Sequence, residues 1–204
     1  IMGSAELIEN GLVKQEDMPR FVGHIRTEAA RLVTLIEDII RLSQLDEGGE
    51  LPFEPVDLKK LAEEASASLA SAAAEKQVTI RVHGDDRQIT TVRRLTSEII
   101  YNLCDNAVKY NREGGSVDVT IDGTAHGAVV TVQDTGIGIP PEHQSRVFER
   151  FYRVDKSHSR QSGGTGLGLS IVKHAVQYLG GRIELESQPG KGTTMRVHFP
   201  DGNV

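Results

Sequence analysis

Tryptophan is absent from the sequence, and aromatic residues make up only 4% of its 204 residues. The hydrophobic core must therefore be built mainly from leucine, isoleucine, valine and alanine. The single cysteine, Cys104, excludes an internal disulfide framework and any metal site with several cysteine ligands. We expect Cys104 to be a small buried residue on a helix, which is an ordinary role for a free cysteine.

Long apolar runs and basic clusters are also missing. No run approaches the ~18 apolar residues that cross a bilayer, and no signal peptide opens the chain. The formal net charge is −6, and no sustained group of lysines and arginines offsets it, which disfavours a nucleic-acid-binding surface. With 38% hydrophobic and 25% charged residues, we expect a soluble, cytoplasmic chain that makes no direct contact with a membrane.

The first 47 residues predict a helical hairpin. Residues 1–12 resemble the end of one helix, and Asp17 and Pro19 are typical of the start of the next. The second helix is expected to run to about Leu45, with apolar residues at alternating spacings of three and four and with Asp38 facing away from them. This apolar seam consists of Val22, Ile25, Ala29, Leu32, Ile36 and Ile39, widened by Leu35 and Leu42.

The seam needs a partner, because two helices alone bury too little apolar surface to be stable in water. We expect it to pack against a second copy of the chain in a four-helix bundle, which gives a homodimer. The alternative is that the seam packs only against the rest of the same chain.

Glycines and prolines between positions 46 and 55 mark a domain boundary. We assign residues 1–47 to the hairpin, 48–55 to a linker and 56–204 to a second domain. Its expected elements are helices at about 57–75, 91–111 and 168–179, a short helix near Pro141, and strands at 78–82, 116–122, 128–133 and on both sides of 189–190. Because adjacent strands are joined by short turns, the expected fold class is α+β, a two-layer α/β sandwich with a mixed sheet.

The helix at 91–111 has one apolar face and one polar face. Glu98, Asn102, Asn106 and Lys109 fall within about 80° of one another around its axis. Amide oxygens suit a hard cation such as Mg²⁺, and a lysine one turn on suits the phosphates that such an ion bridges. The alternative is an ordinary solvated polar face.

Asp134 follows a predicted strand and precedes Gly136 and Gly138. The glycines let the backbone approach a flat ligand closely, while the carboxylate can accept a hydrogen bond from an exocyclic amine. The alternative is a plain strand-to-helix turn.

A glycine-rich segment, Gly163–Ser170, opens the next predicted helix. Free backbone N–H groups and the helix dipole make such a start an anion site. A Rossmann fingerprint is excluded, because the preceding residues 155–162 are polar and form no apolar strand. The long polar stretch from Arg153 to Gly168 instead suits a lid over phosphates.

Between these motifs lies the segment Val147–Arg153. Phe148 and Phe151 are spaced to hold the base of the lid against the core, and Arg150 and Arg153 are candidates for a γ-phosphate or a partner surface. Plain core packing is the alternative for the two phenylalanines.

In this order, the four segments resemble the nucleotide-binding boxes of sensor histidine kinases of two-component systems, which share a family with gyrase, Hsp90 and MutL. Asn102–Tyr110 resembles the N box, Asp134–Gly138 the G1 box, Phe148–Arg153 the F box and Gly164–Gly168 the G2 box. Gly192–Thr194 resembles a strand motif near the adenine. The resemblance implies a Bergerat-type ATP-binding fold and matches the hairpin to the dimerisation and phosphotransfer helices.

The resemblance also implies roles for individual residues. Asn106 would bind Mg²⁺, Lys109 would contact phosphate, and Asp134 would accept the adenine amino group. Tyr110 would stack near the adenine, and Arg153 would lie near the γ-phosphate. The remaining nucleotide-binding residues would be Asn102, Gly136, Gly138, Gly164, Thr165, Gly166, Leu167, Gly168 and Thr193. The catalytic residues would be Glu98, Asn102, Lys109 and Arg153.

Asn102 matches the position where gyrase-like ATPases carry a glutamate base. An amide cannot take a proton from water, which suits a kinase. The implied reaction uses ATP and Mg²⁺ and transfers the γ-phosphoryl group to a protein histidine, for relay to an aspartate of a response-regulator receiver domain. The alternatives are a gyrase-like or Hsp90-like ATPase and a non-catalytic nucleotide-sensing or dimerisation module.

None of the 7 histidines shows the pattern of the phosphate-accepting H box. Residues 1–7 resemble the segment just after that box, so we expect the box within about three helical turns upstream of Ile1. His24 lies in the hairpin, but Ile25, Arg26 and Thr27 follow it, and we interpret it as a solvated helix residue. The resemblance thus implies the cytosolic portion of a membrane-bound bacterial sensor.

Overall fold

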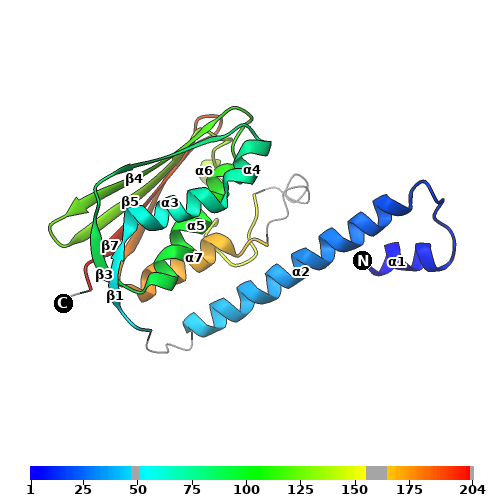
Figure 1. Ribbon diagram of the computed structural model, residues 1–204, viewed down its shortest axis with the longest axis horizontal. Coiled ribbons are helices and arrows are strands. Elements are labelled where there is room, and N and C mark those ends of the chain that lie inside the picture. Colours follow the sequence, from blue (N-terminus) through cyan, green and yellow to red (C-terminus); the bar gives the residue numbers. More distant parts are fainter. Residues whose placement is uncertain (47–50, 155–164, 203–204) are drawn as a thin grey trace.

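A computed structural model describes residues 1–46, 51–154 and 165–202. The chain forms a helical hairpin followed by an α/β domain, and the second helix of the hairpin runs past one side of that domain (Figure 1). The hairpin consists of α1 (Met2–Glu9) and α2 (Met18–Asp46), as the sequence predicted. Among the described residues, no helix is both long enough and apolar enough to cross a membrane.

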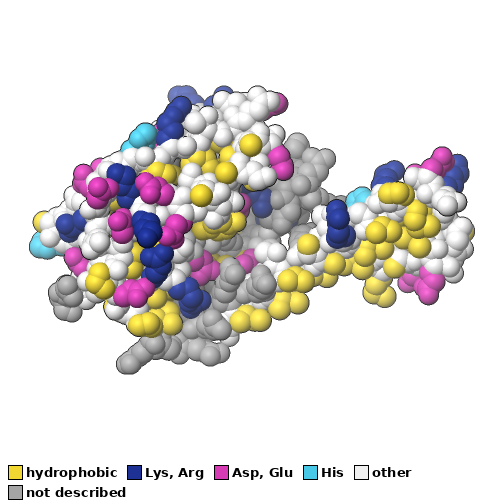
Figure 2. All heavy atoms as spheres, viewed as in Figure 1, with side chains coloured by type: hydrophobic (Ala, Val, Ile, Leu, Met, Phe, Trp, Pro, Cys, Tyr) yellow, Lys and Arg dark blue, Asp and Glu magenta, His cyan; other side chains and the backbone are white. Residues whose placement is uncertain are grey.

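Much of the predicted seam on α2 lies at the surface of the single chain. Val22, Leu32 and Ile36 are 51%, 50% and 56% exposed. Hydrophobic side chains follow the helix in the space-filling view (Figure 2). Leu35 is an exception, because it packs against Leu167 and Ile171 of the α/β domain. Among the described residues, the α/β domain therefore covers only a small part of the apolar surface of α2.

The α/β domain is built on a five-stranded mixed sheet with the strand order β2-β4-β5-β7-β6. The β2–β4 pair is parallel, and the other three pairs are antiparallel. The strands are β2 (Thr79–Gly84), β4 (Ser116–Thr124), β5 (Gly127–Asp134), β6 (Arg182–Gln188) and β7 (Gly192–Pro200). The predicted α+β class, the mixed sheet and the β4–β5 hairpin are confirmed.

Three helices cover one face of this sheet: α3 (Leu58–Ser68), α5 (Arg93–Lys109) and α7 (Gly168–Tyr178) (Figure 1). Alternate residues of β4 point into this layer, so Val117, Val119 and Ile121 are fully buried. Cys104 lies in the same core on α5, as predicted, and burial raises the pKa of its thiol to about 12. The core is thus a single apolar layer between helices and sheet.

The structure differs from the predicted elements in two places. The helix expected at 57–75 is divided into α3 and α4 (Ala70–Glu75) at Leu69. The Ser68 hydroxyl donates to the Glu64 carbonyl at 2.9 Å, a local bond that competes with helix geometry. A short antiparallel ribbon, β1 (Glu54–Asp57) with β3 (Gln88–Thr91), was not predicted, and β1 includes two residues of the expected linker.

Candidate functional site

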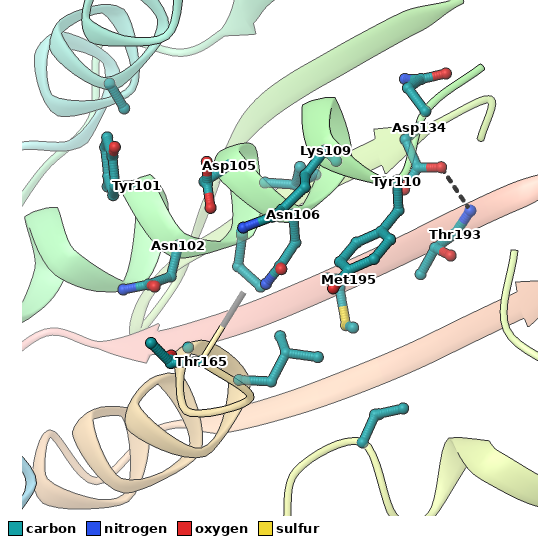
Figure 3. Close-up of a pocket in the computed structure, with 18 of the residues that line it drawn as sticks. Tyr101, Asn102, Asp105, Asn106, Lys109, Tyr110, Asp134, Thr165, Thr193 and Met195 are labelled. Carbon is teal, nitrogen blue, oxygen red and sulfur yellow. Dashed lines mark hydrogen bonds between the residues drawn. The ribbon is translucent and has the colours of Figure 1, made fainter. Parts of the chain in front are cut away.

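A cavity of about 1390 Å³ lies beside α5. Its walls come from α5, from β5 and β7, from the loop after β5, and from the start of α7 (Figure 3). This volume exceeds the roughly 300–1,000 Å³ of ordinary small-ligand pockets, so the cavity has room for an elongated ligand.

The polar face of α5 forms one wall of the cavity. Glu98, Asn102, Asn106 and Lys109 all line it, while Ile99 and Ile100 are fully buried in the core. Leu103 and Ala107 are also buried but border the cavity. The predicted polar row is thus confirmed as a cavity wall, whereas Leu103 and Ala107, predicted on the opposite side, contact both the core and the cavity. The amide nitrogen of Asn102 donates to the carbonyl of Glu98 at 2.8 Å, which leaves the side-chain oxygen to face α7.

Asp134, at the end of β5, marks one end of the cavity. Its Oδ1 accepts a hydrogen bond from the backbone N–H of Gly136 at 2.8 Å. It also accepts one from the backbone N–H of Thr193 at 3.2 Å (Figure 3). Burial raises the pKa of the Asp134 carboxyl, and these two hydrogen bonds oppose that rise. Because the backbone groups engage Oδ1, Oδ2 is the oxygen that Asp134 can offer to a ligand.

The loop after β5 depends on glycine at two positions. A Cβ on Gly136 would lie 2.3 Å from the carbonyl oxygen of Tyr110. Gly138 has φ +69°, and a Cβ there would lie 2.0 Å from the carbonyl oxygen of Gln188. Gly138 lines the cavity, whereas Gly136 is buried and does not. The glycines therefore allow this loop to pack tightly against the backbone at Tyr110 and Gln188. Their close approach to a flat ligand stays a prediction.

The start of α7 faces Asp134 from the far end of the cavity. Thr165, Gly166 and Gly168 line this end, and a Cβ on Gly168 would lie 2.9 Å from the side-chain oxygen of Asn102. Leu167 is fully buried and packs with Ile171, so its side chain does not reach the cavity. Gly164 and most of the predicted lid fall in 155–164, outside the described residues.

The Val147–Arg153 segment contacts the core through one side chain and Gly166 through its backbone. Phe148 packs against the core, as predicted, but the Phe151 side chain is 57% exposed. The hypothesis that both rings hold the lid is therefore wrong for Phe151. Its backbone makes the link instead, because its N–H donates to the Gly166 carbonyl at 2.9 Å. Arg153 lines the cavity, whereas Arg150 is exposed and lies 3.3 Å from His174.

The hairpin also contributes to the cavity, which the sequence did not indicate. Thr34 and Asp38 of α2 line the wall near the start of α7. The Thr165 hydroxyl donates to Oδ2 of Asp38 at 2.8 Å, and Asp38 is only 8% exposed. Helical periodicity could place Asp38 off the seam, but it could not identify this tertiary contact.

Other residues at the cavity or next to it were also not singled out by the sequence analysis. Asp105 lines the cavity, and burial raises the pKa of its carboxyl while Lys109 opposes that rise. Lys76 also lines the cavity, and its ammonium group donates to the carbonyl of Lys109 at the end of α5. Ser187 forms hydrogen bonds behind Thr193. Of these three residues, only Asp105 could have been found from the sequence, because it is an acidic residue within the Asn102–Tyr110 segment.

The metal-binding potential of the cavity rests on neutral oxygen ligands. Within the described part of the chain, no group of three or more His, Cys, Asp or Glu side chains is arranged to hold a metal ion. Asn106 nevertheless places a half-buried amide in the cavity. This fits Mg²⁺, which proteins commonly hold through one or two side chains together with phosphate oxygens and water.

Comparison with known proteins gives a consistent result. A family model described as "Histidine kinase-, DNA gyrase B-, and HSP90-like ATPase" matches residues 91–203. The sensor-like histidine kinase SenX3 of Mycolicibacterium smegmatis is 36% identical over 98% of this chain and 54% of its own. The chain thus spans about half the length of the curated relatives it matches.

Two solved structures are similar across the hairpin and the α/β domain. Full-length ShkA in complex with AMPPNP has a TM-score of 0.77 and 27% identity, covering 97% of this chain and 42% of that one. ThkA in complex with the response regulator protein TrrA has a TM-score of 0.77 and 22% identity, covering 98% and 56%. The chain therefore belongs to the histidine kinase-, DNA gyrase B- and HSP90-like ATPase family, and its α/β domain is an ATP-binding domain of the kind found in sensor histidine kinases.

Proposed function

We propose that this chain is the donor side of a histidine phosphotransfer. It would bind Mg-ATP and pass the γ-phosphoryl group to an imidazole nitrogen of a protein histidine, from which an aspartate of a response-regulator receiver domain would receive it. One observation carries the proposal: a single cavity has an acceptor for a base at one end and amide, lysine and helix N-terminal groups at the other.

The base would lie at the Asp134 end. Oδ2 of Asp134 would accept a proton of the adenine amine, because its Oδ1 already accepts two backbone N–H groups. Tyr110 and Met195 lie next to this end and supply apolar contact area for a flat ring (Figure 3). Gly138 lets the backbone form the edge of the same pocket.

The triphosphate would extend along α5 toward α7. Lys109 and Arg153 would neutralise phosphate charge, and the N–H groups that begin α7 at Gly168 would bind phosphate oxygens. Asn106 would hold Mg²⁺, which would neutralise phosphate charge when bound. Glu98 and Asn102 would complete the wall at the transferring group. The chain would act mainly by positioning and charge neutralisation.

ATP hydrolysis is less well supported. The amide of Asn102 already donates to the Glu98 carbonyl, and its remaining oxygen cannot remove a proton from water. A gyrase-like mechanism requires a general base at this position. Phosphoryl transfer to a reactive imidazole does not, since the acceptor nitrogen carries its own lone pair.

A reconstitution assay tests the proposal. The chain should bind ATP and, with Mg²⁺, place acid-labile, alkali-stable phosphate on a separate polypeptide that carries a histidine-containing dimerisation helix of a SenX3-type kinase. Omitting Mg²⁺, or replacing Asn106 with alanine, should reduce transfer by at least about tenfold. Steady release of inorganic phosphate without transfer would favour the ATPase, and absence of nucleotide binding would contradict both functions.

The partner of the hairpin would be a second copy of the chain. The exposed seam on α2 supports a homodimer, since Leu32, Ile36 and Ile39 leave an apolar stripe at helical spacing in water. The structural relative ThkA was solved with a response regulator protein, and a receiver domain is the corresponding partner proposed here.

Replacing Ile36 with glutamate should convert the dimer to a monomer, because it puts a charge in the centre of the proposed apolar interface. Analytical ultracentrifugation of the full chain measures the change. His24→Glu provides the control, since His24 is exposed on the same helix but off the seam, and this variant should remain dimeric. A monomeric wild-type chain, or an Ile36→Glu dimer of unchanged affinity, would rule out this interface.

A further inference from the structure

Ser187, on β6, lies directly behind the base end of the cavity. Its hydroxyl oxygen is 2.8 Å from the backbone nitrogen of Ile139, 3.0 Å from the carbonyl oxygen of Gly192 and 2.9 Å from the hydroxyl oxygen of Thr193. Ser187 does not line the cavity, but Thr193 does. The hydroxyl of Ser187 is therefore one contact away from a bound base.

Counting protons fixes the direction of these hydrogen bonds. A serine hydroxyl has one proton and two lone pairs. The Ile139 N–H can only donate, and the Gly192 carbonyl can only accept, so Ser187 accepts from the first and donates to the second. The contact with Thr193 can then be made only if Thr193 supplies the proton. Any other arrangement leaves one of the three contacts without a proton.

Thr193 consequently offers only lone pairs to the cavity. Its proton points back toward Ser187, and its backbone N–H donates to Oδ1 of Asp134. Oδ2 of Asp134 is likewise an acceptor when the carboxyl is ionised. Two acceptors from neighbouring strands thus form the polar edge of the base pocket (Figure 3).

Such an edge selects the substituent on a purine. An exocyclic 6-amino group presents N–H donors to both acceptors, whereas a 6-oxo group presents lone pairs and is repelled. We propose that Ser187 is a specificity-determining positioning residue, which holds the Thr193 hydroxyl as an acceptor and thereby favours 6-amino over 6-oxo purine nucleotides. This inference rests on the proposed function, because it assumes that the base binds beside Asp134.

The surroundings of Ser187 keep its hydroxyl in place. The side-chain amide of Gln144 donates to the carbonyls of both Ile139 and Ser187, each at 2.9 Å. These hydrogen bonds hold the loop that carries Ile139, whose backbone N–H donates to the Ser187 hydroxyl. A purely structural role for Ser187 in tying this loop to β6 is the competing explanation, and the test must separate the two.

Isothermal titration calorimetry with ATP and ITP provides that test, since the two nucleotides differ only at the 6-position and the adjoining N1 proton. In Ser187→Ala the Thr193 hydroxyl is free to turn its proton toward a 6-oxo group. The ratio of ATP affinity to ITP affinity should fall by about tenfold, mainly because ITP binds more tightly. Ser187→Thr keeps a hydroxyl at the same place and should retain the wild-type ratio.

A double substitution distinguishes specificity from loop structure. In a Thr193→Val background there is no hydroxyl to orient, so adding Ser187→Ala should leave the ATP/ITP ratio unchanged. Comparing two nucleotides in one variant cancels any loss of folded protein. An unchanged ratio in Ser187→Ala, or an equal change in the Thr193→Val background, would overturn the inference. Wild-type protein that binds both nucleotides equally would also overturn it, whereas wild-type protein that binds neither would overturn the proposed function itself.

Discussion

Replacing Asp134 with asparagine should weaken ATP binding by about 1–3 kcal/mol, the scale for a hydrogen bond to a charged group that is lost in a buried site. The amide oxygen of asparagine would continue to accept from the backbone N–H groups of Gly136 and Thr193. The amide NH₂ group would then take the place of Oδ2 and present donors to the donors of the adenine amine. Calorimetric titration with ATP measures the loss.

Asp122→Asn is the matched control, because Asp122 is an exposed carboxylate on β4 and its loss should leave ATP affinity unchanged. Acid should mimic the Asp134 substitution. Burial raises the pKa of Asp134, so its carboxyl gains a proton, and stops accepting through that oxygen, at a higher pH than an ordinary aspartate. If Asp134→Asn binds ATP as tightly as the wild-type chain, the base does not lie at this end of the cavity.

Replacing Gly192 with alanine should destabilise the domain by about 3–5 kcal/mol, which combines backbone strain with a clash. Gly192 has φ +104°, and a Cβ there would lie 1.9 Å from the carbonyl oxygen of Asp134. Since a backbone atom cannot move aside without displacing Asp134, ATP affinity should fall with stability. Urea unfolding gives the free energy, and titration with ATP gives the affinity.

Gly190→Ala separates the two contributions. Gly190 also has a positive φ, +76°, but a Cβ there would meet nothing within 4 Å. Its substitution should cost only about 1–2 kcal/mol for the left-handed backbone and should leave ATP affinity intact. Equal destabilisation by the two substitutions would show that the close approach of Gly192 to Asp134 carries no energy of its own.

Features that follow from local pattern were predictable from the sequence. The two faces of α5 follow from a 3.6-residue repeat, so the placement of Asn102, Asn106 and Lys109 on one wall was correct before any coordinates. The β-branched residues of β4 and β5, with turn residues between them, correctly predicted the β4–β5 hairpin. These signals arise within a dozen neighbouring residues, where chain geometry alone determines which side chains share a face.

Features that depend on contacts between distant segments were not predictable. The ribbon of β1 with β3 pairs two strands of four residues each, and Pro55 in β1 weakens the strand signal further. Leu167 lies within a glycine-rich motif, yet its side chain packs with Leu35 and Ile171. The Ser187–Thr193 bond depends on the register of β6 against β7. Periodicity contains no information on these pairings.

In the proposed nucleotide complex, Asp38 of α2 and a phosphate group would compete for the hydroxyl proton that Thr165 donates to Asp38 in this structure. The Thr165 hydroxyl can donate either to the α2 carboxylate or to a phosphate oxygen, but not to both at once. Turning α2 so that Asp38 withdraws releases that donor to the cavity, and a ligand that captures the donor loosens α2 by the same free energy. Leu35 packs on Leu167 and Ile171, so α2 also contacts the start of α7 next to this hydrogen bond. A rotation of α2 and the binding of a phosphate group beside Thr165 would thus favour the same change, the loss of the Thr165–Asp38 hydrogen bond, and each would make the other easier.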